Sequence, residues 1–355
     1  MSVEPFTYQT SAYRVLFGSG ILQELEAEIA RLGVARAMVL STPQQTDLCD
    51  TASTLLESRY AARFTEAAMH TPVAVTERAL AVAKAAGVDG FVAVGGGSTT
   101  GLGKALALRT GFPVVAVPTT YAGSEMTSIL GQTEQGEKTT LRDAKVLPRT
   151  VLYDVDLTKS LPPLSSALSG LNAMAHAVEA LYARNRNPVV NLMAEEACRA
   201  LMQALPAIVA EKGGSAGREG ALYGAWLCGI CLEQTEMGVH HKLCHTLGGS
   251  FDLPHAETHA VMLPHTLAYN ADYAPEALDR LARAFGGADP LARIYELLTS
   301  LGGPVGLRDL GMPEAGLERA LDLALAKPYP NPRPLERAAM QGLLARAWAG
   351  EPPAR

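Results

Sequence analysis

The sequence has 355 residues, a mass of 37.4 kDa, a formal net charge of −6 and an isoelectric point near 5.8. A chain of this length usually forms two domains. Its interspersed acidic and basic residues provide no basic face for nucleic acid or an anionic membrane. The N-terminus lacks a secretory signal, and no apolar stretch approaches the roughly 20 residues that cross a bilayer, so we expect a cytoplasmic protein.

The first half alternates short apolar runs with amphipathic segments. Val-rich runs that end in Gly, Pro, Ser or Thr predict four strands, at residues 36–41, 90–98, 113–119 and 150–156. Segments such as 20–33 and 75–87 show helical periodicity. Strands separated by helices favour parallel β-α-β units, so we expect an α/β, Rossmann-like nucleotide-binding domain with a doubly wound sheet.

Three consecutive glycines, Gly95 to Gly97, follow the second predicted strand and precede Ser98 and a helical segment. Residues without a Cβ let the backbone approach a ligand closely, and the N-terminus of the helix offers N–H groups to a phosphate. The pattern is not the G-x-G-x-x-G fingerprint, so a simple tight turn is the alternative.

A second polar turn, with Thr119, Thr120, Gly123 and Ser124, follows the third predicted strand. Loops at the carboxyl ends of neighbouring parallel strands converge on one crevice. The two turns together favour a nucleotide site over a pair of solvated loops.

Apolar positions recur at helical spacing from Ala167 almost to the end of the chain, with hardly any β-rich run. We therefore expect residues 1–160 to form the nucleotide-binding domain and residues 161–355 an all-helical domain. The five cysteines are odd in number and scattered, which argues against disulfides. Cys228 and Cys231 form a C-x-x-C pattern within an apolar run, and we interpret them as buried core residues rather than a redox or zinc pair.

Six of the eight histidines fall within residues 238–265. His241 and His245 are four residues apart, as are Asn172 and His176, so each pair shares a helix face. His255 could return to the same space. A divalent metal would require about four such groups, normally three imidazoles and a carboxylate, whereas the fourth group here is an asparagine. His240, His259 and His265 are each expected to be structural.

The combination of motifs resembles the iron-containing alcohol dehydrogenase family over essentially the whole chain. The segments that carry the resemblance are FGSG (17–20), GGGSTTGLGKA (95–105), PTTYAGSEMT (118–127), GLNAMAHAVEALY (170–182) and HKLCHTLGGSFDLPHAETHAVMLPH (241–265). The fold that the resemblance implies is the one shared by dehydroquinate synthase-like and iron-containing alcohol dehydrogenase proteins. Within the family, the sequence is most similar to members that reduce the carbon–carbon double bond of a small dicarboxylate.

The resemblance implies a metal-ligand set, if a metal is bound, at Asn172, His176, His241 and His255. The metal-dependent members have an aspartate at the position of Asn172, and the family pattern has another at Gly101. Both differences remove negative charge, which disfavours tight iron or zinc binding and suits a dianionic substrate. We therefore expect a weak metal site or none.

The resemblance also implies how NADH or NADPH would bind. Gly95, Gly96, Gly97 and Ser98 would embrace the pyrophosphate. Thr119 and Thr120 would line the adenosine and ribose side, and Lys138 would approach the nicotinamide ribose. Ser41, Thr42 and Gln44 stand where NAD-selective members carry a carboxylate, so a 2′-phosphate would meet no repelling charge.

The implied reaction is a conjugate reduction, in which an enolate develops and needs a hydrogen-bonding or cationic partner. We expect His241 and His245 to stabilise the oxyanion and deliver a proton, while His176, His255 and Asn172 shape the pocket. The alternatives are a metal-dependent alcohol or diol dehydrogenase, a dehydroquinate synthase-like lyase and a non-catalytic nucleotide-binding protein. Residues 7–20 alternate as a strand would, and the resemblance implies that such a segment pairs with a second subunit in a homodimer.

Overall fold

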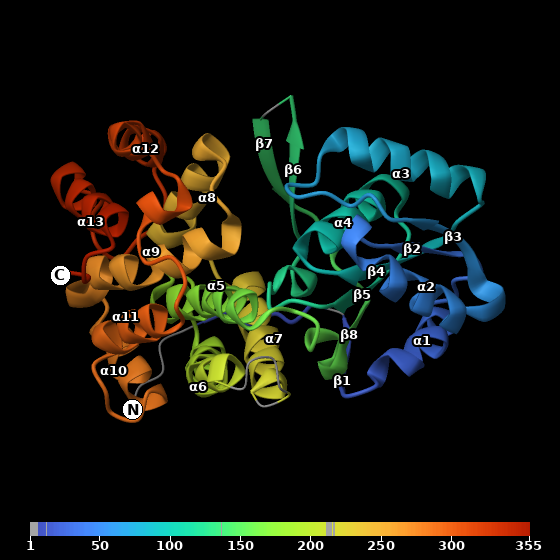
Figure 1. Cartoon of the computed structure of the whole chain (residues 1–355), viewed down its shortest axis with the longest axis horizontal. Helices are drawn as coiled ribbons and strands as arrows, with labels where there is room; N and C mark the ends of the chain where they lie inside the picture. The colour runs from blue at the N-terminus through green and yellow to red at the C-terminus, as the bar shows by residue number, and fades with distance from the viewer. Residues whose placement is uncertain (1–5, 12, 136, 211–214, 216) are drawn as a thin grey trace. The chain divides into compact units, whose positions relative to one another are not determined.

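The structure is a computed structural model that describes residues 6–11, 13–135, 137–210, 215 and 217–355, apart from the side chains of Glu137 and Lys138. The chain divides into two compact units (Figure 1). The sheet unit is Thr10–Leu161, and the helical unit is Met1–Gln9 together with Pro162–Arg355. The predicted fold class, an α/β first half and an all-helical second half, is confirmed.

A six-stranded parallel sheet forms the centre of the sheet unit, with the strand order β1-β8-β5-β4-β2-β3. Its strands are β1 (Arg14–Gly18), β2 (Ala37–Leu40), β3 (Tyr60–Phe64), β4 (Gly90–Gly95), β5 (Val114–Pro118) and β8 (Thr150–Asp154). The four predicted strands are β2, β4, β5 and β8, which are buried and rich in Val. The sequence analysis did not identify β3, which is mostly half-buried or exposed.

Helices cover both faces of this sheet (Figure 1). Side chains alternate along a strand, so Val92 and Val94 of β4 pack with α1 (Leu25–Arg31) and α2 (Thr46–Leu55). Phe91 and Ala93 pack on the other face, with α3 (Val73–Ala85) and α4 (Gly97–Thr110). The doubly wound arrangement follows from this two-sided burial.

Two segments of the sheet unit differ from the expected pattern. An antiparallel hairpin of β6 (Ile129–Glu134) and β7 (Glu137–Arg142) was not predicted. Of the segment 7–20, only β1 is a strand, and it pairs with β8 of the same sheet. The described residues before Tyr13 make no ladder within this chain, and the pairing of the segment with a second subunit stays a prediction.

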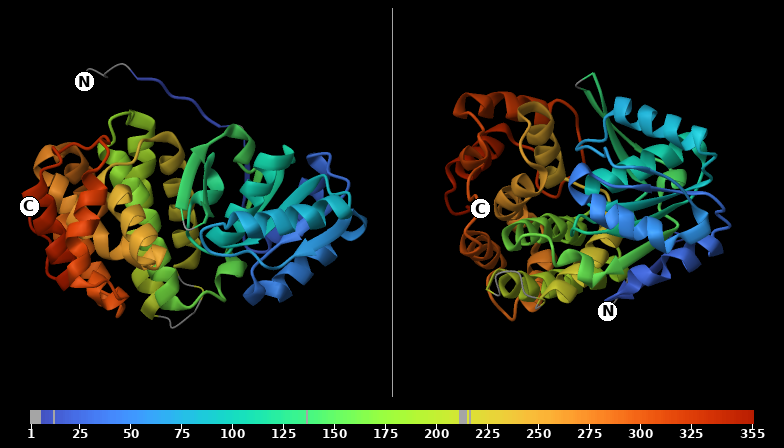
Figure 2. Two further views of the ribbon diagram at one scale, coloured as in Figure 1. Left: turned by 90° about the horizontal axis from the view of Figure 1, so that it is seen from above. Right: turned by 45° about the vertical axis from the view of Figure 1, so that its right-hand side comes forward.

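The helical unit consists of nine α-helices that Figure 2 shows from two further sides, with residues 211–214 and 216 outside the described part. They are α5 (Pro163–Tyr182), α6 (Pro188–Ala210), α7 (Arg218–Gln234), α8 (Val239–Phe251), α9 (His255–Asn270), α10 (Pro275–Ala284), α11 (Pro290–Ser300), α12 (Leu317–Leu325) and α13 (Arg337–Ala349).

Helix α5 is the central helix of this unit, and it contacts α6, α7, α9 and α10. Every residue from Ser166 to Tyr182 is buried, as expected for a helix that is apolar on all sides. Cys228 and Cys231 on α7 are buried free thiols, as expected for core residues. Among the described helices, none is long and apolar enough to span a membrane.

Candidate active site

The glycine turn joins β4 to α4 in the sheet unit. Gly95 has φ 150°, and a Cβ there would approach Thr99 Oγ1 within 2.5 Å, so the turn requires glycine at this position. Gly97 is exposed, and Gly96 and Ser98 are half-buried. No side chain caps the first turn of α4, a helix of 14 residues. The start of α4 is therefore suited to bind an anion such as a pyrophosphate.

Gln45, which the sequence analysis did not single out, connects the loops that follow three neighbouring strands. Its Nε2 donates to Thr119 Oγ1 at 2.9 Å, after β5. Its Oε1 lies 3.4 Å from Thr42 Oγ1, after β2, and 2.7 Å from a Cβ placed on Gly95, the last residue of β4. Since β2, β4 and β5 are adjacent, these loops lie together at the carboxyl edge of the sheet.

The predicted ribose-side residues differ in exposure. Ser41 is fully buried, and its hydroxyl donates to Thr42 O, so it faces the protein. Thr42 is half-buried and Gln44 is exposed, which leaves these two available to a ligand. Thr119 is buried and Thr120 is half-buried. Lys138 lies in β7 opposite Thr133, and its side chain lies outside the described residues.

The polar turn after β5 is held by Lys104, a second residue that the sequence analysis missed. This fully buried lysine of α4 donates to Ser124 O, to Thr127 Oγ1 at 2.9 Å and to Ile129 O at 2.9 Å. The turn also contains Glu125, whose pKa is raised by burial. A buried ammonium group that donates to this many oxygens fixes the turn firmly.

Gly101, where the family pattern has an aspartate, packs against Thr71. A Cβ at this position would approach Thr71 Oγ1 within 2.3 Å. Thr71 is buried, with a positive φ of 47°. The packing therefore leaves no space for an acidic side chain at position 101, since any side chain here would displace Thr71.

The second candidate region is a cluster of histidines from three helices of the helical unit. Asn172 and His176 come from α5, His240, His241 and His245 from α8, and His255 and His259 from α9. The rings of His176 and His241 stack at 4.9 Å, and those of His241 and His259 meet edge-on at 5.0 Å. The structure therefore brings the predicted site histidines into one cluster.

His259, expected to be structural, lies at the centre of this cluster. Its ring contacts those of His176, His240, His241, His245 and His255 at centroid distances of 4.4–6.4 Å. His245 and His255 are exposed, whereas His240 and His259 are fully buried. The spacing of His255 and His259, one helical turn apart, could have identified His259. His265 lies further along α9, where burial and the nearby Arg346 charge lower its pKa to about 4.

Four polar atoms of the cluster are buried and have no hydrogen-bond partner among the described residues. They are Asn172 Oδ1, His176 Nδ1, His241 Nε2 and His259 Nε2. Leaving one such atom unsatisfied typically costs about 1–3 kcal/mol. Four in one place indicate a site that is completed by a ligand.

Glu179 on α5 fixes the orientation of His241. Its Oε2 lies 2.5 Å from His241 Nδ1, and both side chains are almost fully buried. The carboxylate holds the Nδ1 proton and stabilises a positive charge on the ring, so Nε2 is the atom offered to a ligand. Glu179 carries no sequence signature of its own, but its position three residues after His176 places it on the same helix face.

His240 and His259 belong to a hydrogen-bond chain that ends at Thr266. The Thr266 hydroxyl donates to Met262 O at 3.0 Å, so its oxygen accepts from His240 Nδ1 at 2.9 Å. His240 Nε2 then accepts from His259 Nδ1 at 2.9 Å. His259 Nε2 is therefore a hydrogen-bond acceptor. Burial, followed by repulsion from the neighbouring histidines, lowers the pKa of His176, His240 and His259 well below 6.5, so these rings are neutral.

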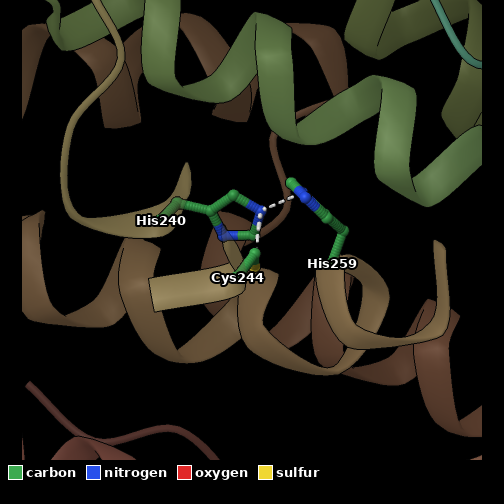
Figure 3. A group of neighbouring side chains, drawn as sticks. All are labelled: His240, Cys244 and His259. Atoms are coloured by element: carbon green, nitrogen blue, oxygen red, sulfur yellow. Dashed lines mark hydrogen bonds between the residues drawn. The ribbon is translucent and has the colours of Figure 1, made fainter. Parts of the chain in front are cut away.

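One set of three side chains among the described residues comes close enough to hold a metal ion, namely His240, Cys244 and His259 (Figure 3). The short contact between the two imidazoles is a hydrogen bond, as the dashed line shows. Burial raises the pKa of the Cys244 thiol well above 9.0, which disfavours the thiolate that metals bind. We therefore interpret this set as part of the hydrogen-bond chain.

The ligand set implied by the family fits a metal poorly. His176, His241 and His255 do not bring three ligand atoms within 4.8 Å of one another, whereas ligands of a tetrahedral zinc lie roughly 3.4 Å apart. The fourth group, Asn172, is neutral. The carboxylate of Glu179 is bound to His241 and to backbone N–H groups.

Comparisons with known proteins agree over both units. The model of the iron-containing alcohol dehydrogenase family matches residues 12–155, and that of the C-terminal part of the Fe-containing alcohol dehydrogenase family matches residues 166–348. Maleylacetate reductase of Sphingobium indicum is 51% identical over 98% of this chain and 99% of its own.

Two solved structures of maleylacetate reductases are similar to the chain. That of Rhizobium sp. strain MTP-10005 is 52% identical with a TM-score of 0.94, and that of Agrobacterium tumefaciens is 52% identical with a TM-score of 0.95. Each alignment covers 99% of this chain and 100% of the other. The chain therefore belongs to the iron-containing alcohol dehydrogenase family.

Proposed function

We propose that the chain is a maleylacetate reductase, which uses NADH or NADPH to reduce the double bond of maleylacetate to 3-oxoadipate in the catabolism of aromatic compounds. The observation that carries the proposal is the similarity to maleylacetate reductases over nearly the whole chain. The group of four unsatisfied buried polar atoms beside a carboxylate-bound histidine supports a ligand site in the helical unit.

The reaction takes a hydride from the nicotinamide, a proton from the protein and no other reactant. The hydride adds to the alkene carbon β to the ketone, and the electron pair of the double bond moves to form an enolate. A proton then adds to the α carbon, which restores the ketone. The protein must stabilise the enolate oxygen and supply one proton.

His241 is the best candidate for the enolate oxygen, because Glu179 binds its Nδ1 and directs Nε2 to the ligand. His245, one turn further along α8 and exposed, is placed to exchange the proton with solvent. His176 and His255 line the same cluster. Asn172 offers an amide where a carboxylate would repel a dicarboxylate substrate.

The cofactor is proposed to bind at the carboxyl edge of the sheet. Gly95, Gly96, Gly97 and Ser98 would hold the pyrophosphate at the start of α4. Thr119 and Thr120 would face the adenosine side, and Lys138 the nicotinamide ribose. Thr42 and Gln44 repel neither a ribose hydroxyl nor a 2′-phosphate, so we propose that both NADH and NADPH are used.

The family name refers to iron, and we propose that turnover of this protein does not depend on a metal. The support is chemical: the ligand set has no carboxylate of its own, and its nitrogens are not gathered around one point. The four unsatisfied atoms also suit the alternative function, a metal-dependent alcohol or diol dehydrogenase. A dehydroquinate synthase-like lyase is a less favoured alternative, since the histidine cluster offers no phosphate-binding group.

One assay tests the proposal. The absorbance of NADH and of NADPH is followed with maleylacetate, and with a short alcohol or diol and the oxidised cofactors. We expect oxidation of both reduced cofactors in the presence of maleylacetate and a 3-oxoadipate product. Turnover with the alcohols alone would establish the alternative and contradict the proposal.

We also propose a homodimer. Phe6 and Tyr8, which precede the edge strand β1, are 48% and 38% exposed, an apolar surface that a second copy would cover.

A further inference from the structure

The first turn of α8, which carries His241, is held by two side chains from distant parts of the helical unit. Glu179 Oε1 accepts from Gly238 N at 3.1 Å and from His240 N at 2.9 Å. Asn331 Oδ1 lies 3.3 Å from Val239 N. These are the N–H groups that a helix cannot satisfy internally. The turn is therefore capped from outside, at three successive residues.

Asn331 belongs to a proline-rich loop, residues 329–335, between α12 and α13. The loop is fastened to the end of α9. Asn331 Nδ2 donates to Asn270 Oδ1 at 2.7 Å, and Asn270 Nδ2 donates to Asn331 Oδ1 at 3.1 Å. Arg333 stacks over the Tyr269 ring at 4.4 Å, and Tyr269 Oη donates to Pro334 O at 2.6 Å. The position of Asn331 is therefore fixed by several contacts.

A cavity borders this turn on one side. A cavity of about 530 Å³ is lined by Glu179, Gly238, Pro330, Asn331 and Pro332, and by none of the cluster histidines. Gly238 admits the close approach of its partners, because a Cβ there would lie 3.1 Å from Asn331 Oδ1 and 3.2 Å from Glu179 Oε1. Val239 packs in the hydrophobic core, and the hydrogen bonds from Glu179 and Asn331 hold the backbone of the turn on the side of the cavity.

We propose that Glu179 and Asn331 are positioning residues, which together place the first turn of α8 so that His241 Nε2 faces the ligand. The inference rests on the proposed role of His241 in the reduction. Glu179 acts twice, on the backbone of the turn and on the His241 ring. Asn331 acts only on the backbone of the turn, and it couples the position of the turn to that of the proline-rich loop.

The kinetic test compares wild type with Glu179→Gln, Asn331→Ala and the double variant. Loss of a partner that orients a functional histidine typically lowers activity about 10- to 100-fold, and we expect this range in kcat for Glu179→Gln. Asn331→Ala should lower kcat about threefold to tenfold, since it leaves the ring partner in place. KM for NADH should change by less than about twofold in each. Because both residues hold one turn, the double variant should lose less than the product of the two effects.

The matched control is Asn187→Ala. Asn187 is buried, whereas Asn331 is half-buried, and Asn187 Oδ1 accepts from Val189 N and Val190 N at 3.1 Å at the start of α6. Asn187→Ala should lower the melting temperature at least as much as Asn331→Ala but leave kcat within about twofold of wild type. If either Glu179→Gln or Asn331→Ala keeps wild-type kcat, or if Asn187→Ala loses as much, the proposal is overturned. Should Glu179→Gln fail to fold, Gly238→Ala disturbs the same contacts and must lower kcat.

A second measurement needs no substrate. A proton shared over 2.5 Å between an imidazole and a carboxylate gives a strongly downfield proton NMR signal, which labelling of histidine with ¹⁵N would identify. We expect the signal of His241 in wild type, its loss in Glu179→Gln and its shift in Asn331→Ala. An unchanged signal in both variants refutes the positioning role. If the signals behave as expected and wild type does not reduce maleylacetate, the positioning role stands and the proposed function falls.

Discussion

Replacing Asn172 with aspartate tests the central electrostatic argument. Asn172 is 3% exposed and lies one turn before His176 on α5. With the enolate oxygen at His241, we take a separation on the order of 5 Å between a substrate carboxylate and a carboxylate at position 172. At an effective dielectric constant of about 20, two unit charges at that distance repel by about 3 kcal/mol.

This repulsion predicts that Asn172→Asp weakens binding of a dicarboxylate on the order of 100-fold. The assay is competitive inhibition by succinate and by its monomethyl ester, since only the dianion keeps a second charge near position 172. Calorimetry with Zn²⁺ should in turn show tighter metal binding than in wild type, because the variant supplies the missing carboxylate.

Asn191→Asp on α6 is the control for the cost of burying a carboxylate. Asn191 is buried, and its Oδ1 also has no hydrogen-bond partner among the described residues. It should affect folding stability without changing the preference between the two inhibitors. If Asn172→Asp folds and binds succinate as wild type does, the placement of the substrate beside Asn172 is wrong.

The remaining predictions concern metal, cofactor, pH and assembly. Wild type should keep its activity after chelation and contain far less than one iron or zinc per chain by elemental analysis; stoichiometric metal whose removal abolishes turnover would contradict this. Catalytic efficiencies with NADH and NADPH should agree within about 100-fold, and Thr42→Asp should selectively lower the efficiency with NADPH. Equal effects on both cofactors would contradict the placement of the loop after β2 beside the adenosine ribose. The folded pKa of His265 is about 4, below the unfolded value of 6.5, so the unfolded state binds more protons between these values. Because of this residue, the free energy of unfolding should fall by about 2 kcal/mol between pH 7 and pH 5. In urea titrations at the two pH values, the fall for His265→Gln should be smaller than that for wild type by this amount. Light scattering should give the mass of a dimer at micromolar concentrations; a monomeric mass would refute the assembly.

The buried strands and the glycine turn could be predicted because their signals are local. Val-rich runs such as β4 and β5 are apolar on both faces, and Gly95 marks the turn directly. By contrast, β3 and β6 are mostly half-buried or exposed, so their sequences lack a clear apolar period. The partner of β3 is β2, about 20 residues earlier in the chain, and a single sequence does not reveal such a pairing.

The candidate site could be predicted only where helical spacing placed two groups on one face. The pairs Asn172–His176 and His241–His245 were found in this way. Glu179, Gln45, Lys104 and Asn331 were missed, since each acts through a contact 20 or more residues away in the chain. His259 was judged alone, and a single histidine gives no sign that five other rings surround it.

The hydrogen-bond chain from Thr266 determines which polar group His259 offers to a ligand. Thr266 is fully buried, and its single hydroxyl proton, donated to Met262 O, fixes the direction of each later hydrogen bond in the chain. Removing that hydroxyl, as in Thr266→Val, would free both imidazoles to exchange tautomers, and His259 could then present a proton in place of a lone pair. A single buried hydroxyl of α9 thus sets whether His259 Nε2 accepts or donates a hydrogen bond.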